Sequence, residues 1–312
     1  MSLVEDLRIG SSEVRETHIS WVFLFDAHVF KLKKPVNFGF LDFTTLEGRR
    51  AACQAEVTLN RRLAPGVYLG VVPVLRSAAG RHRFGQELLA GSAALPAPAG
   101  AGAGNEECVD YAVQMLRLSD EDRADVRLAH GRFGRDEIEQ LATLLSRFHA
   151  SAAAGPAVDV FGRRENVARN VQENFAQAHD ALAAIASDRE QREVEERQLG
   201  FLSNHAALFD QRILARRIRD GHGDLRLEHV YFQNGGAPRV IDCIEFNERF
   251  RYGDVCADIA FLSMDLAVHD RVVEKERLVA AYARESGDHD LSALLDFYES
   301  YRAYVRAKIA AI

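Results

Sequence analysis

The sequence predicts an α+β protein in which a β-rich first third precedes a mainly helical remainder. Aromatic and β-branched residues gather in short runs up to residue 118, and from about residue 119 apolar residues recur at helical spacing. We therefore expect two domains, 1–118 and 119–312. With 47% apolar residues, the chain can bury a large core.

Five short runs predict the strands of the first domain. The first two, WVFLF and VFKLKK, flank the polar break DAH and indicate a β-hairpin. The five runs are residues 21–25, 29–34, 68–75, 83–89 and 108–116. The small-residue tract 90–107 is too poor in apolar bulk to pack, and we expect a mobile loop between strands there.

One helix is expected between the second and third strands. Thr44 with Glu47 three residues later is typical of a capping box, and APG at 64–66 ends the pattern. Apolar residues repeat at helical spacing over Ala52, Leu59 and Leu63.

A glutamate interrupts this apolar face. Glu56 lies on the side that the helix should bury, and a buried carboxylate needs a partner. Lys31 is the candidate, because it occupies an alternating position of the 29–34 run. Alternatively, Lys31 is an edge-strand lysine that only discourages aggregation.

The second domain reads as helical over most of its length. The clearest amphipathic segments are 136–152 and 167–186, and a last helix covers 291–312. That helix runs to the end without a cap, so either the chain was cut from a longer one or its last turn frays.

Composition excludes several classes of protein. The formal charge of −7 argues against general nucleic-acid binding and suits a cationic substrate. The four cysteines form no CxxC pair, which fits a reducing cytosol better than a zinc ribbon or a disulfide framework. No long apolar run or secretory leader occurs, so we expect a soluble, cytoplasmic protein without a membrane partner.

The stretch HGDLRLEHVYF, residues 222–232, concentrates ionisable groups before an apolar run. The runs VYF and RVID are separated by Asn234-Gly235, a strong turn signal, and predict a second hairpin. Counting outward from the turn brings His229 roughly opposite Asp242, with Asp224 on the loop before the first strand. Such crowding of carboxylates calls for a divalent cation or a shared proton, and a loop carboxylate can accept a proton from a hydroxyl.

Taken alone, this hairpin supports function and structure about equally, since an aspartate before a strand is often a turn former. The order of parts along the chain favours function. A strand lysine (Lys31), a helix glutamate (Glu56), a loop aspartate (Asp224) and a strand-end aspartate (Asp242) follow one another as in phosphoryl transfer by protein-kinase-like folds.

Two long segments carry a family resemblance. HGDLRLEHV followed by VIDCIEFNERFRYGDVCADIAFLSMDL resembles the catalytic and metal-binding motifs of the aminoglycoside phosphotransferase family, within the protein-kinase-like superfamily. Residues 28–74 resemble an uncharacterised branch of that family, some members of which are fused to a P-loop ATPase domain. The resemblance covers about residues 8–310 and implies a bilobal fold with a β-rich N-lobe and a mainly helical C-lobe.

The resemblance also implies roles for individual residues. Lys31 would contact the α- and β-phosphates of ATP and pair with Glu56, Asp224 would be the catalytic base, and Asp242 would hold Mg²⁺. The catalytic loop would be 222–229 and the metal segment 240–247, both in the C-lobe. The backbone of 114–118 would meet adenine through Met115, Leu116 and Leu118, and His222, Asp254 and Asp258 would fix the catalytic loop and its flanking helix.

The sequence departs from the family pattern at two places. Where the pattern HGDxxxxN has asparagine, this chain has His229, which puts the second metal position in doubt. Either His229 ligates Mn²⁺, or it bonds Asp242 while Glu245 supplies an oxygen. No GxGxxG run occurs near the first hairpin, so phosphates would be covered by Thr17, His18 and Ser20.

Three hypotheses follow. The first is an ATP- and metal-dependent phosphotransferase acting on a hydroxyl of a small molecule, with the acceptor near Glu165, Asn166, Asn170 and Asn174 unless these are only a solvated helix face. The second is a non-catalytic nucleotide-binding module that regulates a partner or fused domain, such as a P-loop ATPase. The third treats His222, Asp224, His229 and Asp242 as a hydrolytic metal centre.

Overall fold

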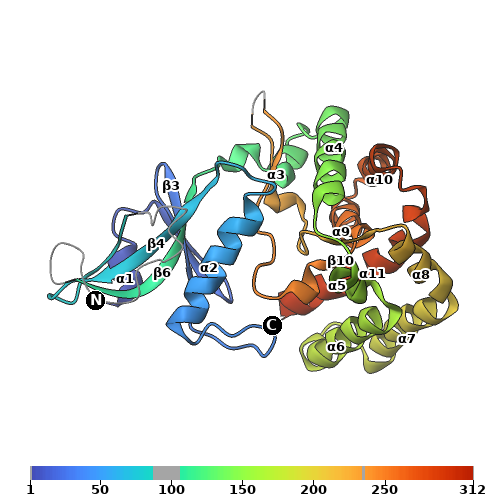
Figure 1. Ribbon diagram of the computed structural model, residues 1–312, viewed down its shortest axis with the longest axis horizontal. Helices are drawn as coiled ribbons and strands as arrows, with labels where there is room; N and C mark the ends of the chain where they lie inside the picture. Colours follow the sequence, from blue (N-terminus) through green and yellow to red (C-terminus); the bar gives the residue numbers. More distant parts are fainter. Residues whose placement is uncertain (1, 87–105, 234–235, 312) are drawn as a thin grey trace. The chain divides into compact units, whose positions relative to one another are not determined.

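The computed structural model describes residues 2–86, 106–233 and 236–311, and these divide into two units (Figure 1). The first unit comprises Met1–Asp120 together with Arg239–Asn247, and the second comprises Glu121–Pro238 and Glu248–Ile312. The expected boundary at 118/119 lies within two residues of the first division. The segment 240–247, which we assigned to the second domain, belongs instead to the first unit, because its charged side chains pair with lysines there.

The first unit is built on a six-stranded antiparallel sheet. Its strand order is β1-β2-β3-β6-β4-β5. The strands are β1 (Glu13–Glu16), β2 (Ser20–Leu24), β3 (His28–Lys33), β4 (Tyr68–Arg76), β5 (His82–Phe84) and β6 (Glu107–Leu116). The predicted hairpin is confirmed, since β2 pairs with β3 and the N–H of Phe25 donates to the carbonyl of His28.

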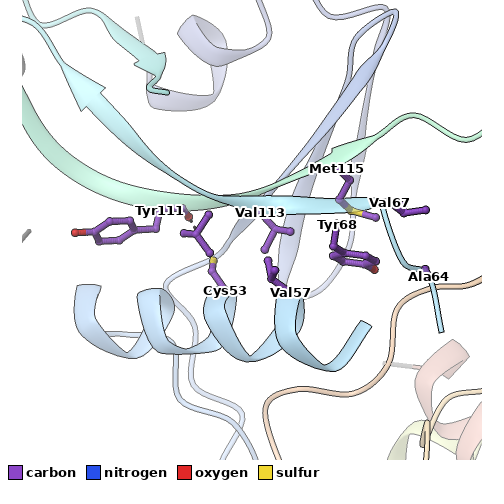
Figure 2. Close-up of a cluster of buried hydrophobic side chains, with 9 residues drawn as sticks. Cys53, Val57, Ala64, Val67, Tyr68, Tyr111, Val113 and Met115 are labelled. Carbon is purple, nitrogen blue, oxygen red and sulfur yellow. Dashed lines mark hydrogen bonds between the residues drawn. The ribbon is translucent and has the colours of Figure 1, made fainter. Parts of the chain in front are cut away.

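Helix α2 (Leu46–Asn60) covers one face of this sheet. Cys53 and Val57 project from α2 against Val113 and Met115 of β6 and against Tyr68 of β4 (Figure 2). Residues on the other face, among them Leu32 and Ala112, form a separate apolar cluster with the short helix α1 (Leu3–Leu7). Because side chains alternate along a strand, this arrangement turns Lys31 and Lys33 of β3 toward α2.

The predicted cap of α2 is wrong by one residue. The hydroxyl of Thr45 accepts from the N–H of Gly48 at 3.1 Å, which makes Thr45 the N-cap. Thr44 instead donates its hydroxyl to Asp42 at 2.6 Å, and the Glu47 carboxylate pairs with Arg50. The position three residues after Thr45 is therefore a glycine, and no capping box forms.

The second unit is mainly helical, which confirms the α+β class with a β-rich first part and a helical second part. Its α-helices are α3 (Ala124–Ala129), α4 (Arg135–Ser151), α5 (Pro156–Asp159), α6 (Arg164–Leu182), α7 (Asp188–Asn204), α8 (Ala206–Leu214), α9 (Val255–Val268), α10 (Val272–Ser286) and α11 (Ser292–Ala311). Helix α9 is buried almost all round. Short strands β7 (Ile218–Asp220) and β10 (Tyr252–Asp254) pair antiparallel at its start.

The second predicted hairpin is shorter than expected. Strands β8 (Val230–Tyr231) and β9 (Arg239–Val240) occupy its two runs, and Phe232, Ile241 and Asp242 lie outside them. The Asn234-Gly235 turn and most of the loop expected over 90–107 lie outside the described residues, while Glu107 already belongs to β6. Within the described ranges, no helix is both long and apolar enough to span a bilayer.

Candidate functional site

Five charged side chains of the first unit form one cluster, which we call the lysine cluster. It consists of Lys31 and Lys33 from β3, Glu56 from α2, and Asp242 and Glu245 from the 239–247 segment. Lys31 Nζ lies 3.0 Å from Glu56 Oε1 and 2.5 Å from Asp242 Oδ1. Lys33 Nζ lies 2.7 Å from Glu56 Oε2 and also donates to Glu245. The two lysines thus share one glutamate, and each binds a further carboxylate.

Burial sets the electrostatics of this cluster. Burial opposes the charge on Lys31, but the carboxylates of Asp242 and Glu56 outweigh it and hold the pKa of Lys31 well above its ordinary value. Burial likewise opposes the charge on Glu56, yet the two lysines lower its pKa. For Glu245, burial prevails over the nearby Lys33 and raises the pKa. The lysines are therefore held charged beside carboxylates that differ in proton affinity.

The backbone of the 239–247 segment is anchored on α2 and β4. The N–H of Asp242 donates to the hydroxyl of Tyr68 at 3.1 Å, and the N–H of Cys243 donates to the side chain of Asn60 at 2.8 Å. Asn60 in turn donates to the carbonyl of Glu56. Asp242 has φ of 64°, a left-handed conformation that aspartate tolerates better than most residues. Its side chain is 41% exposed, whereas those of Lys33, Glu56 and Glu245 are at most 4% exposed.

In the second unit, Asp258 of α9 holds the loop 222–229 in place. Its carboxylate accepts from the N–H of His222 at 2.7 Å and from the N–H of Gly223 at 2.9 Å. His149 of α4 contacts the same carboxylate at 3.2 Å. A Cβ on Gly221 would lie 2.6 Å from Asp258, so only glycine permits this approach. These contacts keep the loop backbone rigid just before Asp224.

The Asp224 side chain is 29% exposed and contacts Arg226. Arg226 donates through Nε and Nη2 to Asp224 Oδ2, at 3.3 and 3.2 Å, and also pairs with Glu228. The N–H of Asp224 faces the ring of His222 at 3.3 Å. Asp224 is therefore a part-exposed carboxylate whose position is set by its own loop, which suits a group that must reach a substrate hydroxyl.

His229 has both ring nitrogens engaged within this loop. Nδ1 lies 2.7 Å from the carbonyl oxygen of Asp224, and because a carbonyl only accepts, Nδ1 carries the proton. Nε2 lies 3.2 Å from Arg226 Nη2, which donates to it. A metal would have to displace Arg226 to reach the Nε2 lone pair. His229 itself lies in the 3₁₀ turn Leu227–His229, just before β8, and not in a strand.

The residues expected to support the loop and its flanking helix make identifiable contacts. Asp258 holds the loop backbone, as described above. Asp254 caps α9 by accepting from the N–H of Cys256 at 2.8 Å, and it pairs with Arg212 at 2.6 Å. Of the residues that the structure describes, no group of three or more His, Cys, Asp or Glu has the arrangement of a metal site. The predicted metal role of Glu245 would have to compete with Lys33, which binds its carboxylate.

The predicted phosphate-covering residues lie at the turn between β1 and β2. The Thr17 hydroxyl accepts from the N–H of Ser20 at 3.0 Å and so closes that turn. His18 is exposed, whereas Ser20 is fully buried and its hydroxyl has no hydrogen-bond partner within the described ranges. A nucleotide could therefore meet His18 directly, but would reach Ser20 only if the turn opened.

The predicted adenine-contacting segment ends β6. Met115 is buried in the cluster of Figure 2, and Leu118 packs against that cluster. Leu116 is 39% exposed, and its N–H donates to the carbonyl of Val67 at 2.8 Å. An adenine contact at Leu116 would therefore involve a group other than this N–H.

Sequence reasoning missed Lys33, Tyr68 and Asn60. Lys33 could have been predicted, because residues two positions apart in a strand share one face and Lys33 therefore lies on the same side as Lys31. Tyr68 and Asn60 act on a segment about 180 residues away, and no local pattern marks them. Of the expected acceptor residues, Asn166 and Asn174 have hydrogen-bond partners and Glu165 pairs with Arg164, whereas Asn170 lines a pocket described below.

Comparisons with known proteins bear on this site. The sequence model of the phosphotransferase enzyme family (APH) matches residues 62–301. Uncharacterized proteins of Mycobacterium bovis and of two strains of Mycobacterium tuberculosis are each 35% identical over 300 residues, which is 96% of this chain. The same match covers 55% of each relative, so the chain spans about half their length.

Solved structures were also compared. An aminoglycoside 2'-phosphotransferase in complex with GDP is 13% identical, with a TM-score of 0.49 over 96% of this chain and 85% of that chain. A spectinomycin phosphotransferase in complex with ADP and spectinomycin is 10% identical, with a TM-score of 0.46 over 94% of this chain and 78% of that chain.

Proposed function

This chain belongs to the phosphotransferase enzyme family, and we propose that it transfers the γ-phosphoryl group of ATP to a hydroxyl group of a small molecule. The observation that carries the proposal is the position of Lys31, whose ammonium contacts both a helix glutamate and the carboxylate of Asp242. A strand lysine paired with a helix glutamate is what protein-kinase-like enzymes use to hold phosphates.

The first unit supplies the groups proposed to bind the nucleotide. Lys31 contacts the α- and β-phosphates and Glu56 keeps its ammonium in place, while Met115, Leu116 and Leu118 line the adenine. Thr17, His18 and Ser20 cover the phosphates. The part-exposed Asp242 carboxylate is the hard oxygen donor that Mg²⁺ prefers, so a cation can reach it. Mg²⁺, or Mn²⁺ in its place, neutralises charge on the phosphates when bound.

The second unit supplies the proposed base. Asp224 accepts the proton of the attacking hydroxyl, and Arg226 holds its carboxylate in one orientation. The proton moves from the acceptor oxygen to an oxygen of Asp224 as that acceptor oxygen bonds to phosphorus and the bond to the β-phosphate oxygen breaks. Little covalent chemistry is asked of the protein beyond position and charge.

An Asp224→Asn variant tests this assignment. We expect ADP release with hydroxylated acceptors to fall by about 10³-fold or more, because the amide cannot accept the proton. Nucleotide binding by calorimetry should be unchanged. Asp210→Asn, on the exposed face of α8, is the matched control and should retain full activity. Transfer at the normal rate by the Asp224 variant would refute the assignment.

The position of His229 supports a second candidate. Its ring occupies the place of the family asparagine, with both nitrogens engaged by the loop. A non-catalytic nucleotide-binding module, acting on a partner or on a fused P-loop ATPase domain, would bind ATP without consuming it. Calorimetry with ATP and either Mg²⁺ or Mn²⁺, set beside ADP release over a broad acceptor panel, distinguishes the two.

A further inference from the structure

The second unit contains a small pocket whose wall is rich in arginine. It has a volume of about 50 Å³ and lies between the start of α6, the β10 region and the middle of α11. One water molecule needs roughly 10–15 Å³ of cavity volume, so the pocket can hold a group of about three to five heavy atoms. Four arginines line it, although the chain as a whole carries a charge of −7.

Two of these arginines have carboxylate partners and two have none. Arg249 pairs with Glu173 and Arg251 pairs with Asp220. Arg302 and Arg219, in contrast, have no carboxylate within 4 Å among the residues that the structure describes. The pocket also contains Asp254 and Asp258, but the first is held by Arg212 and the second by backbone N–H groups.

Arg302 is the most telling of the four. It is 7% exposed, its Nε donates to the carbonyl of Ala257 at 3.2 Å, and its guanidinium lies 4.9 Å from the centroid of the Phe261 ring. Burial raises the pKa of Asp258, but His149 and, more weakly, the charges of His222 and Arg302 lower it. A buried guanidinium without an ion-pair partner is costly, and an anion entering the pocket would offset that cost.

Asn170 adds a second orphan group to the same wall. Its Oδ1 is buried and has no hydrogen-bond partner within the described part of the chain. Buried polar atoms are nearly always satisfied by protein, water or ligand. A hydroxyl of a bound molecule would satisfy Asn170 while an anionic group faces Arg302.

The pocket adjoins the loop that carries Asp224. Gly221 lines it and precedes Asp224 by three residues. Three residues of chain span at most about 10 Å, so a molecule held in the pocket is within reach of the base.

We propose that this pocket binds the anionic group of the acceptor, and that the substrate is a small hydroxylated acid, a carboxylate or a phosphate, whose reactive hydroxyl reaches Asp224. The proposal rests on the proposed function for the identity of the base. The size of the pocket favours a carboxylate, which has three heavy atoms, over a phosphate, which has five.

Matched acceptors test the proposal on the full chain with ATP and Mg²⁺. All four acceptors carry hydroxyl groups. Ribonate adds a carboxylate and ribose 5-phosphate adds a phosphate, whereas ribitol is uncharged and choline carries a cation. We expect ADP release with ribonate or ribose 5-phosphate at a kcat/KM at least about tenfold above that with ribitol or choline, since a hydrogen bond to a charged group is worth a factor of that size. The ratio between the two anions identifies the anionic group.

Arg302 variants assign the effect to the pocket. Arg302→Gln should raise KM for the preferred anion about 10–100-fold while kcat and the KM for ATP stay within about twofold. Arg302→Lys, which keeps the charge, should recover part of the loss, and Arg277→Gln, an exposed arginine of α10, should have no effect. Calorimetric titration of ribonate and ribose 5-phosphate into each variant gives a readout that does not depend on turnover.

The outcomes separate this proposal from the proposed function. Equal or better transfer to ribitol or choline, or an unchanged KM in Arg302→Gln, would overturn the anion pocket and leave the phosphotransferase standing. Anion binding that Arg302→Gln abolishes, without transfer to any acceptor, would leave the pocket standing and overturn the enzyme. Absence of both anion binding and transfer would overturn both.

Discussion

The lysine cluster and the Asp224 loop hold their carboxylates in different ways. In the first unit, Glu56 and Glu245 are buried and are paired with Lys31 and Lys33. In the second unit, Asp224 is part-exposed and is oriented by the loop that carries it. In a buried network of opposite charges, removing one side chain leaves another buried without a partner. A residue proposed to bind the nucleotide there therefore also contributes to the stability of the fold. A part-exposed carboxylate on a rigid loop can be lost with little effect on folding, so chemistry and stability are separable there.

The largest expected effect is on the stability of the lysine cluster. Lys33→Met should lower the free energy of unfolding by about 3–5 kcal/mol, because Glu245 would remain buried without a cation and Glu56 would keep only Lys31. Urea unfolding measures this. The control is Lys34→Met, since Lys34 pairs with Glu16, whose side chain is 65% exposed, and its loss should cost at most about 1 kcal/mol. Similar losses for both lysines would mean that the cluster is not a coupled unit.

The next largest effect is on the free energy of unfolding that Asp258 contributes by anchoring the loop 222–229, and it depends on pH. Burial raises the pKa of Asp258, but the hydrogen bond and charge of His149 and the charge of His222 outweigh it, so the folded-state pKa lies below the ordinary 3.8. The unfolded chain therefore takes up the proton first as pH falls. The stabilisation is complete above about pH 4 and is lost as pH falls through the folded-state pKa.

Asp258→Asn checks this sign. The variant should be less stable than the parent by about 2–3 kcal/mol at pH 6, and the difference should shrink at pH 3. Urea unfolding at the two pH values gives both numbers. A stability gap that is the same at pH 6 and pH 3 would show that the carboxylate charge does not anchor the loop.

A smaller effect is expected where the 239–247 segment is attached. Tyr68→Phe removes the hydroxyl that accepts from the N–H of Asp242, at a cost of about 1–2 kcal/mol. Affinity for ATP should fall several-fold in calorimetry, because Asp242 loses its backbone support. Tyr111→Phe, in the same apolar cluster, serves as the control and should leave ATP affinity unchanged. Unchanged ATP affinity in the Tyr68 variant would show that the position of Asp242 does not affect nucleotide binding.

The smallest effect on stability is expected in the Asp224 loop, in contrast to the lysine cluster. Arg226→Met should change the free energy of unfolding by less than about 1 kcal/mol, because its ion pair with Asp224 is part-exposed. It should nevertheless lower kcat about tenfold, since the base loses its orientation. Loss of several kcal/mol in this variant would show that the Asp224 loop is coupled to folding after all.

Local sequence was sufficient for the elements that carry these groups. Short runs of aromatic and β-branched residues predicted the β2–β3 hairpin and the strands β4 and β6, and helical spacing predicted α2, α4 and α6. The unfavourable position of Glu56 on the apolar face of α2 was enough to expect a cationic partner, and Lys31 does contact it. These inferences succeeded because they depend on neighbours within one strand or one turn.

Other features depend on contacts between segments far apart in the chain. The assignment of Arg239–Asn247 to the first unit, the role of Lys33 and the support of Asp242 by Tyr68 join residues about 170–210 positions apart. The sequence does not distinguish Arg302 from any other arginine on a helix. Only the structure shows that it is buried without a carboxylate partner within 4 Å among the described residues. Pattern and propensity describe what one segment prefers, whereas the partner that a buried charge acquires is set by which segments the folded chain brings together.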